Sequence, residues 1–310
     1  MAKRIELETT AVNLPGGWSG RVVTVCPSPR AALVAPRCLP TLEQWLPVLR
    51  QLITDASALP GRAVLKSSRD VRVIRAEVPC GQGLLPIICK QTRARGLRRR
   101  AARRLQGSRE RRNFARAVTL LGAGIRTPLP LALIERRSPS SAWLITHFVA
   151  DLVDLDEMAL RVLPQLEPAF SRAIKETATD AVVDLFDTLE RHRLFHRDLK
   201  ASNILLADLD HRARRAAAWI VDLDGLRRCV HLSPARRWQP LMRLGASLLD
   251  ADTITRADHL RFLRRYLRRT RRPKSEWKAA FRRLAARAGR YRGRSARRKT
   301  HKLDGFTGEA

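Results

Sequence analysis

The sequence lacks a long apolar run and lacks a recognisable secretion signal. Its longest apolar stretch, residues 84–89 (LLPIIC), has the length of a strand, whereas a membrane-spanning helix needs ~18 residues. The N-terminal residues MAKRIELETT contain no apolar core of the kind found in signal peptides. These absences predict a cytoplasmic protein and leave open peripheral binding to a membrane surface.

Cysteine is scarce, and its spacing carries no motif. The five cysteines stand at 26, 38, 80, 89 and 229, and no Cys-x-x-Cys pair occurs. The sequence therefore indicates neither a disulfide framework nor a zinc site. We expect reduced thiols that pack as small hydrophobic side chains.

Acidic and aromatic residues are both few. Lys and Arg number 61 against 29 Asp and Glu, which gives a net charge of +32, and aromatic residues make up 5%. Such a balance attracts polyanions, namely nucleic acid, anionic lipid headgroups or phosphorylated glycans. The shortage of stacking aromatics and of nucleic-acid motifs argues against a nucleic-acid binder. Because arginine is spread along the chain, a merely solvated basic surface is the alternative interpretation.

The apolar content, 45% of 310 residues, is ample for one large domain or for two lobes. No internal repeat is present. We divide the chain into an N-terminal extension with a short strand and a helix (1–58), a β-rich lobe (59–150), a mainly helical lobe (151–289) and a basic tail expected to be disordered (290–310). This order predicts an α+β protein with a small antiparallel lobe and a larger helical lobe.

Local patterns predict the elements of the first part of the chain. Residues 21–26 read as a strand, and Thr41 with Gln44 forms a capping box that opens a helix over 41–55, in which Pro47 predicts a kink or a later start. Alternation and turn residues then predict strands at 63–65, 71–78, 84–90 and 141–149, and a helix at 108–121.

The second part reads differently. An amphipathic helix over 171–191 precedes a polar loop at 196–203, and two apolar strands, ILLADLD and AAWIVDLD, flank a polar turn. Further helices are predicted at 235–250, 256–269 and 275–289.

The strongest chemical signal is the loop HRDLKASN at 196–203. Phosphoryl transfer to a hydroxyl needs a carboxylate near the hydroxyl proton, a cation at the γ-phosphate and oxygen ligands for Mg²⁺. Asp198, Lys200 and Asn203 supply these groups in that order, and the loop matches the kinase pattern H-R-D-L-x-x-x-N. His196 and Arg197 are expected to brace the backbone.

A second carboxylate follows an apolar strand. Asp222 ends WIVD, 19 residues beyond Asn203 by their numbers, and is the expected Mg²⁺ ligand. The kinase pattern at this point is Asp-Phe-Gly, whereas here Leu223 and Asp224 precede Gly225. This departure argues against a protein-kinase-type activation segment, and we expect Asp224 to cap the next turn rather than bind a second ion.

Nucleotide-binding residues are predicted in the β-rich lobe. Lys90 closes IICK like the lysine of the V-A-I-K strand, and Glu110 on the following helix is its expected partner, although nearby arginines compete for it. The turn after the first strand of this lobe has no G-x-G-x-x-G. Ser67 and Ser68 are the expected phosphate contacts in its place.

Together, LPIICK with Glu110, HRDLKASNILL and IVDLDG resemble the bacterial lipopolysaccharide core kinases, the Kdo-kinase and heptose-kinase group of the protein-kinase-like superfamily. The resemblance covers about residues 60–270 and includes RWQPLMRLGASLL and RFLRRYL. It implies a two-lobe kinase-like fold. It further implies ATP and Mg²⁺ as cofactors and transfer of the γ-phosphate to a sugar hydroxyl of the lipid-linked inner core, at the cytoplasmic face of the inner membrane.

The acceptor is accordingly expected to be an anionic glycolipid, and peripheral contact with an anionic membrane agrees with the charge. Other interpretations stay open. A small-molecule kinase would more often carry His-Gly-Asp in this loop, and a protein kinase would carry Asp-Phe-Gly and Ala-Pro-Glu. A non-catalytic kinase-like binding protein would not need Asp198, Asn203 and Asp222 intact.

Overall fold

The structure is a computed structural model of the chain. It describes residues 7–26, 36, 38–94, 96, 107–137, 140–210, 212–213, 215–271, 278–287 and 289–290. The chain separates into two compact units, Met1–Ala150 (unit 1) and Asp151–Ala310 (unit 2). The finer division into four segments stays a prediction.

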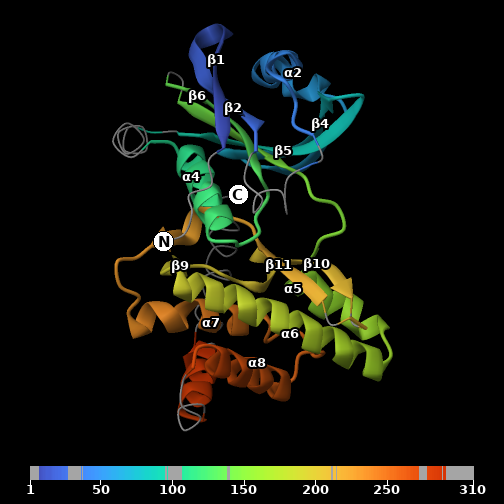
Figure 1. Cartoon of the computed structure of the whole chain (residues 1–310), viewed down its shortest axis with the longest axis vertical. Helices are drawn as coiled ribbons and strands as arrows, with labels where there is room; N and C mark the ends of the chain where they lie inside the picture. Colours follow the sequence, from blue (N-terminus) through green and yellow to red (C-terminus); the bar gives the residue numbers. More distant parts are fainter. Residues whose placement is uncertain are drawn as a thin grey trace, which may run out of the picture. The chain divides into compact units, whose positions relative to one another are not determined.

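Unit 1 is built on a seven-stranded sheet in the order β1-β2-β6-β7-β5-β4-β3, and each neighbouring pair is antiparallel (Figure 1). The strands are β1 (Glu8–Leu14), β2 (Trp18–Val25), β3 (Ala63–Ser67), β4 (Val71–Cys80), β5 (Gly83–Arg93), β6 (Pro130–Arg136) and β7 (Ser141–His147). The predicted meander is β3, β4 and β5. The last of these strands continues to Arg93, beyond the predicted end at Lys90.

The N-terminal hairpin β1–β2 belongs to this sheet, because β2 pairs with β6. The sequence analysis predicted only a strand at 21–26 and assigned it to an N-terminal extension, separate from the β-rich lobe. Val12 and Leu14 of β1 are buried, as is Trp18 at the start of β2. Four polar residues in ETTAVNL mask the alternation of β1, so its pattern alone did not predict a strand.

Helix α2 (Leu42–Asp55) begins at the predicted cap. The Thr41 side chain accepts a hydrogen bond from the Gln44 backbone, and the Gln44 side chain accepts one from the Thr41 backbone, which confirms the capping box. Pro47 lies inside the helix. Trp45 and Leu49 are fully buried, and α2 contacts β4, so the helix covers one face of the sheet.

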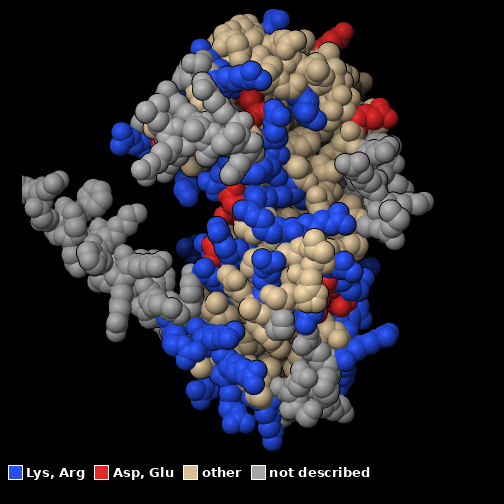
Figure 2. Space-filling model, turned by 90° about the vertical axis from the view of Figure 1, so that its left-hand side faces the viewer, with Lys and Arg blue, Asp and Glu red and all other residues tan. Residues whose placement is uncertain are grey.

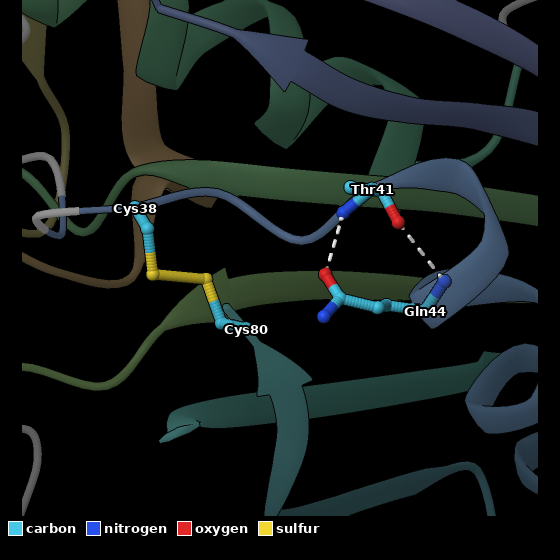
Figure 3. The surroundings of a disulfide bond; sticks show 4 residues. All are labelled: Cys38, Thr41, Gln44 and Cys80. Carbon is cyan, nitrogen blue, oxygen red and sulfur yellow. Dashed lines mark hydrogen bonds between the residues drawn. A yellow bond between two sulfur atoms is a disulfide. The ribbon is translucent and has the colours of Figure 1, made fainter. Parts of the chain in front are cut away.

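A disulfide joins Cys38, just before α2, to Cys80 at the end of β4 (Figure 3). The prediction that all cysteines are reduced is therefore wrong for this pair. The two residues are 42 positions apart, with Cα atoms 6.4 Å from each other. Packing of α2 against β4 brings them together, and no local spacing could have shown it. Cys26, Cys89 and Cys229 take part in no disulfide in the described part of the chain, as expected.

Helix α4 (Arg109–Gly122) lies on the other side of the sheet from α2 (Figure 1). Ser108 caps it, since its hydroxyl accepts a hydrogen bond from the Arg111 backbone. Phe114 on this helix is buried with Val23, Leu133 and Leu144 of three strands. The basic segment before α4 lies largely outside the described residues.

Unit 2 is mainly helical, with a three-stranded sheet β11-β10-β8 and a two-stranded sheet β12-β9. Its main elements are β8 (Val153–Asp154), α5 (Leu155–Glu157), α6 (Pro168–Arg191), β9 (Leu194–His196), β10 (Ile204–Asp210), β11 (Arg215–Ile220), β12 (Leu226–Arg228), α7 (Pro234–Ser247) and α8 (Arg256–Arg269). Phe186 of α6 packs edge-on against Phe262 and Tyr266 of α8, and this contact joins the two helices.

The predicted loop, hairpin and helices of this part correspond to described elements. The predicted third helix is helical over 278–287 and 289–290, and the tail from 291 lies outside the described residues. Within the described part of the chain, no helix combines the length and apolar character needed to span a bilayer.

Candidate active site

The candidate catalytic loop of unit 2 is anchored by apolar residues within it. Strand β9 leads into the loop and pairs with β12, and Leu226 lies opposite His196. Leu199 and Ala201 are fully buried on either side of Lys200, while Arg197 and Lys200 are exposed. Burial of Leu199 and Ala201 fixes the backbone of the loop, while the side chains of Arg197 and Lys200 point outward.

His196 braces this loop, as predicted from its position. Its Nδ1 accepts a hydrogen bond from the Asp198 backbone N–H at 3.3 Å, and its Nε2 lies 3.1 Å from the carbonyl oxygen of Asp222. This pattern requires a neutral ring that donates through Nε2. Burial lowers the pKa of His196 against the opposing effect of Asp222 and Asp198, so the ring stays neutral at pH 7.

Gly225 makes room for the histidine. A Cβ at this position would lie 2.9 Å from His196 Cε1 and 3.2 Å from the backbone N of Asp198. The Arg197 N–H donates to the Gly225 carbonyl at 3.0 Å. The glycine is therefore required by the close approach of the turn after β11 to the catalytic loop.

Asp198 and Asn203 are held by one network of hydrogen bonds. The Asn203 Nδ2 donates to the Asp198 carbonyl at 3.0 Å, and the Asn203 side chain is buried. The Asp198 side chain is 51% exposed, so its carboxylate is open to solvent. Lys200 is exposed.

Asp222 lies next to this network. The Val221 N–H donates to the Asn203 carbonyl at 3.0 Å, which ties the strand end that carries Asp222 to the loop. Asp222 is exposed and adopts the left-handed conformation, with φ 55°. A non-glycine residue in this region carries roughly 1–2 kcal/mol of strain, which is a recurrent property of functional positions.

The turn after Asp222 is a short helical turn, Leu223–Gly225, and its N-cap residue is Asp222 rather than the predicted Asp224. Asp222 makes no side-chain cap hydrogen bond there. The Asp224 carbonyl accepts a hydrogen bond from Arg227 at 3.2 Å. Strand β12 follows at once, and α7 begins at Pro234, so the connection is short.

In unit 1 the sheet register places Lys90 in a cross-strand row. Lys90 of β5 lies opposite Val73 of β4, which lies opposite Lys66 of β3. Directly opposed residues on antiparallel strands project from the same face. Lys66 therefore shares the face of Lys90, a feature that the sequence analysis missed.

Glu110 is completely buried beside this row. Its Oε2 accepts a hydrogen bond from Thr92, and its Oε1 is buried with no hydrogen-bond partner among the described residues. Burial raises the pKa of Glu110, and the Lys90 charge is one of the opposing effects that lower it. The pairing of Lys90 with Glu110 stays a prediction.

Ser67 and Ser68, the predicted phosphate contacts, take part in different contacts of the β3–β4 hairpin. Ser67 lies opposite Arg72, which lies opposite Gln91, so its side chain projects from the face away from Lys90. Ser68 closes the β3–β4 hairpin, since its N–H donates to the Val71 carbonyl at 2.8 Å and its hydroxyl donates to the same oxygen at 3.1 Å. Phosphate binding by the two serines stays a prediction.

A further charged side chain reaches the catalytic loop. Arg243 Nη1 of α7 lies 3.5 Å from Asp198 Oδ1. The sequence analysis did not single out Arg243, because arginine is too common in this chain to carry a signal.

A family model described as the lipopolysaccharide kinase (Kdo/WaaP) family matches residues 62–266, which is more than half of the chain. The chain belongs to this family. The resemblance seen in the sequence motifs is confirmed, and with it the assignment of a kinase. The kinase-like α+β fold is likewise confirmed.

Solved structures were compared with the chain as well. The structure "WaaP in complex with acyl carrier protein" shares 25% identity with this chain, covers 76% of it and 89% of its own chain, and has a TM-score of 0.55. A rhoptry kinase from Toxoplasma gondii matches at 13% identity and a TM-score of 0.42, over 74% of this chain and 81% of its own. No curated protein matches this sequence.

Proposed function

We propose that this lipopolysaccharide-family kinase transfers the γ-phosphoryl group of ATP to a sugar hydroxyl of an anionic, membrane-presented glycolipid such as the lipopolysaccharide inner core. The observation that carries the proposal is the arrangement of Asp198, Asn203 and Asp222. Hydrogen bonds through Asn203 and His196 hold these three residues around one network in unit 2. Such an arrangement matches the needs of phosphoryl transfer.

Asp198 is the group that receives the proton. Its carboxylate is solvent-accessible, and its backbone is fixed by His196 and Asn203. The acceptor O–H bond breaks, the proton passes to the carboxylate, and the hydroxyl oxygen bonds to the γ-phosphorus. The bond from that phosphorus to the bridging oxygen breaks, and ADP leaves with its electron pair.

Cationic side chains balance the phosphate charge in this proposal. Lys200 reaches the γ-phosphate from the catalytic loop, and Lys90 holds the α- and β-phosphates. The buried Glu110 orients Lys90, since a buried carboxylate with an unpaired oxygen gains from a nearby ammonium. Lys66 lies on the same face of the sheet as Lys90, and we propose it as a further phosphate-binding cation.

The oxygens present suit Mg²⁺. Asn203 uses its amide nitrogen toward Asp198, which leaves its amide oxygen for a metal, and Asp222 offers an exposed carboxylate. No cluster of three or more His, Cys, Asp or Glu side chains suited to a metal occurs among the described residues, and Mg²⁺ commonly uses only one or two protein carboxylates plus phosphate oxygens. When bound there, the ion neutralises charge on the phosphates.

The net charge of +32 supports an anionic acceptor at an anionic surface. Lys and Arg side chains predominate over Asp and Glu on the face shown in Figure 2. On α8 the exposed arginines are Arg256, Arg264, Arg268 and Arg269. We place the enzyme at the cytoplasmic face of the inner membrane on this ground. We expect the arginine-rich segment 97–106 to take part in this contact, and it lies outside the described residues.

A protein partner is proposed as well, because the similar WaaP structure is a complex with acyl carrier protein. Unit 2 contains an apolar cavity of about 300 Å³ between α6, α7 and α8, lined in part by Ala178, Val182, Leu244, Phe262 and Leu263. An acyl chain is the kind of group that such a cavity would bind. Purified protein should then co-elute with acyl carrier protein, and Ala178→Trp, which fills the cavity, should reduce that co-elution.

The function is tested with γ-labelled ATP and a panel of acceptors. We expect label on a core-type glycolipid, and loss of that label in Asp198→Asn. Label on protein or on a neutral antibiotic but never on an anionic glycolipid would contradict the proposed acceptor and leave the kinase assignment intact. Liposome binding should weaken between 0.1 M and 1 M salt, as the Debye length falls from ~10 Å to ~3 Å, while ATP binding should change less.

A further inference from the structure

One face of α7 contacts the catalytic loop through three polar side chains on successive turns of the helix. Gln239, Arg243 and Ser247 are four residues apart and so lie on the same face of the helix. Gln239 Nε2 donates to the Arg197 carbonyl at 3.2 Å, and the Ala201 N–H donates to Ser247 Oγ at 2.8 Å. These outer contacts hold the loop backbone.

Arg243, the middle residue, contacts a side chain instead of the backbone. Its Nη1 lies 3.5 Å from Asp198 Oδ1. The Arg243 side chain is 19% exposed, against 51% for that of Asp198. The guanidinium is thus the more buried of the two groups.

The surroundings explain why the contact is more than a surface ion pair. Burial lowers the pKa of the Arg243 guanidinium, while the Asp198 charge opposes this effect. Arginine nonetheless stays protonated at neutral pH, because its ordinary pKa is far higher. A partly desolvated charge interacts more strongly with its neighbour than a fully hydrated one does.

We propose that Arg243 is a positioning residue, which holds Asp198 Oδ1 so that Oδ2 faces the acceptor hydroxyl and takes its proton. This inference rests on the proposed role of Asp198. A half-exposed aspartate otherwise rotates about two side-chain bonds, and a misplacement of ~1 Å can lower a rate by about 10²-fold. Because Gln239 and Ser247 fix the loop backbone, Arg243 is left to fix the carboxylate.

The test compares the variants Arg243→Met, Arg243→Lys and Asp198→Asn. Arg243→Met should lower kcat by roughly 10- to 100-fold and leave the KM for ATP within about threefold. Arg243→Lys should recover part of kcat, since a lysine restores the charge but not the planar guanidinium geometry. Arg236→Met is the matched control, because Arg236 is exposed on the same helix and contacts Cys229 instead.

A double-mutant cycle separates this role from a structural one. If Arg243 acts through Asp198, adding Arg243→Met to Asp198→Asn should change the residual kcat by less than about threefold. Additive losses would overturn the inference, as would an effect only on the KM for the acceptor. Should Arg243→Met fail to fold, the same cycle is run with Arg243→Lys.

The outcomes also separate the inference from the function on which it rests. Full activity in Arg243→Met together with a large loss in Asp198→Asn would contradict the positioning role alone. Full activity in Asp198→Asn would instead contradict the proposed catalytic assignment, whatever the Arg243 variants do.

Discussion

The candidate residues of the two units are held in place by different means. In unit 2, Asp198, Lys200 and Asn203 lie within six residues of sequence, and backbone contacts join them to Asp222. In unit 1, Lys66, Lys90 and Glu110 come from two strands and a helix, and only the register of the sheet and the packing of α4 bring them into one region.

This difference indicates what the candidate residues of each unit depend on. Local hydrogen bonds keep the catalytic loop in shape, so single substitutions there should act on chemistry directly. The arrangement of Lys66, Lys90 and Glu110 in unit 1 depends on long-range pairing, so it should respond to changes far from Lys90. The following predictions test that contrast.

The largest effect is expected for Asp222→Asn, which removes one negative charge from the proposed metal site. We predict a fall in kcat of about 10³-fold, within the range for loss of a key electrostatic group. Asp208→Asn is the control, since Asp208 is also exposed and also has positive φ, 52°. Comparable activity in the two variants, measured with γ-labelled ATP, would rule out the metal role.

Loss of the Cys38–Cys80 disulfide should destabilise unit 1 and spare unit 2. Opening a loop of 42 residues is expected to lower the free energy of unfolding by about 3–4 kcal/mol. Cys38→Ser, Cys80→Ser and the double variant should be equally affected, with faster hydrogen exchange in α2 and β4. Cys229→Ser is the control in unit 2, and unequal single variants would argue for a packing effect instead.

Lys90→Met should reduce kcat/KM for ATP by about 10²-fold, because one phosphate-binding cation is lost. Glu110→Gln leaves the Lys90 ammonium in place and should cost less activity. Steady-state kinetics at varied ATP concentration would measure both. Near-normal kcat/KM in Lys90→Met would contradict the resemblance to the V-A-I-K strand.

Gly225→Ala should lower the free energy of unfolding by about 1–3 kcal/mol, the usual range for overpacking. The added Cβ would press on His196, 2.9 Å away at Cε1. Gly245→Ala is the control, since the nearest atom to its Cβ is His259 Nδ1 at 4.0 Å and alanine favours the helix. Urea denaturation of both variants would show whether the contact with His196 is as tight as the structure has it.

The smallest effect is expected for Lys66→Met. Lys66 is exposed, so its attraction to phosphate is screened, and we predict a rise in the KM for ATP of roughly threefold to tenfold. Arg69→Met, on the adjoining hairpin turn, serves as the control for loss of a charge. An unchanged KM in Lys66→Met would show that the cross-strand row does not reach the nucleotide.

Sequence analysis predicted the features that depend on short spacings. The catalytic loop and the capping box at Thr41 each lie within eight residues, so their chemistry is visible in the sequence itself. The strand that ends near Lys90 was also predicted, because apolar β-branched residues outline it. The family assignment followed from these same motifs.

The remaining features depend on contacts between distant residues. The pairing of β2 with β6 and the Cys38–Cys80 disulfide each join positions far apart in sequence. The position of Lys66 on the same face as Lys90 is visible only from the strand register. The contact of Arg243 with Asp198 depends on how α7 is rotated about its axis. The sequence does not show this rotation, and it offers many other arginines.

The short connection after Asp222 has a consequence for regulation. Strand β12 is already paired with β9 by Arg228, and α7 starts at Pro234. Many kinases are switched on by phosphorylation of a long segment at this point, which moves from disorder to order. Here only residues 229–233 separate β12 from α7, too few for a segment of that kind, so regulation by phosphorylation is not expected at this point of the chain.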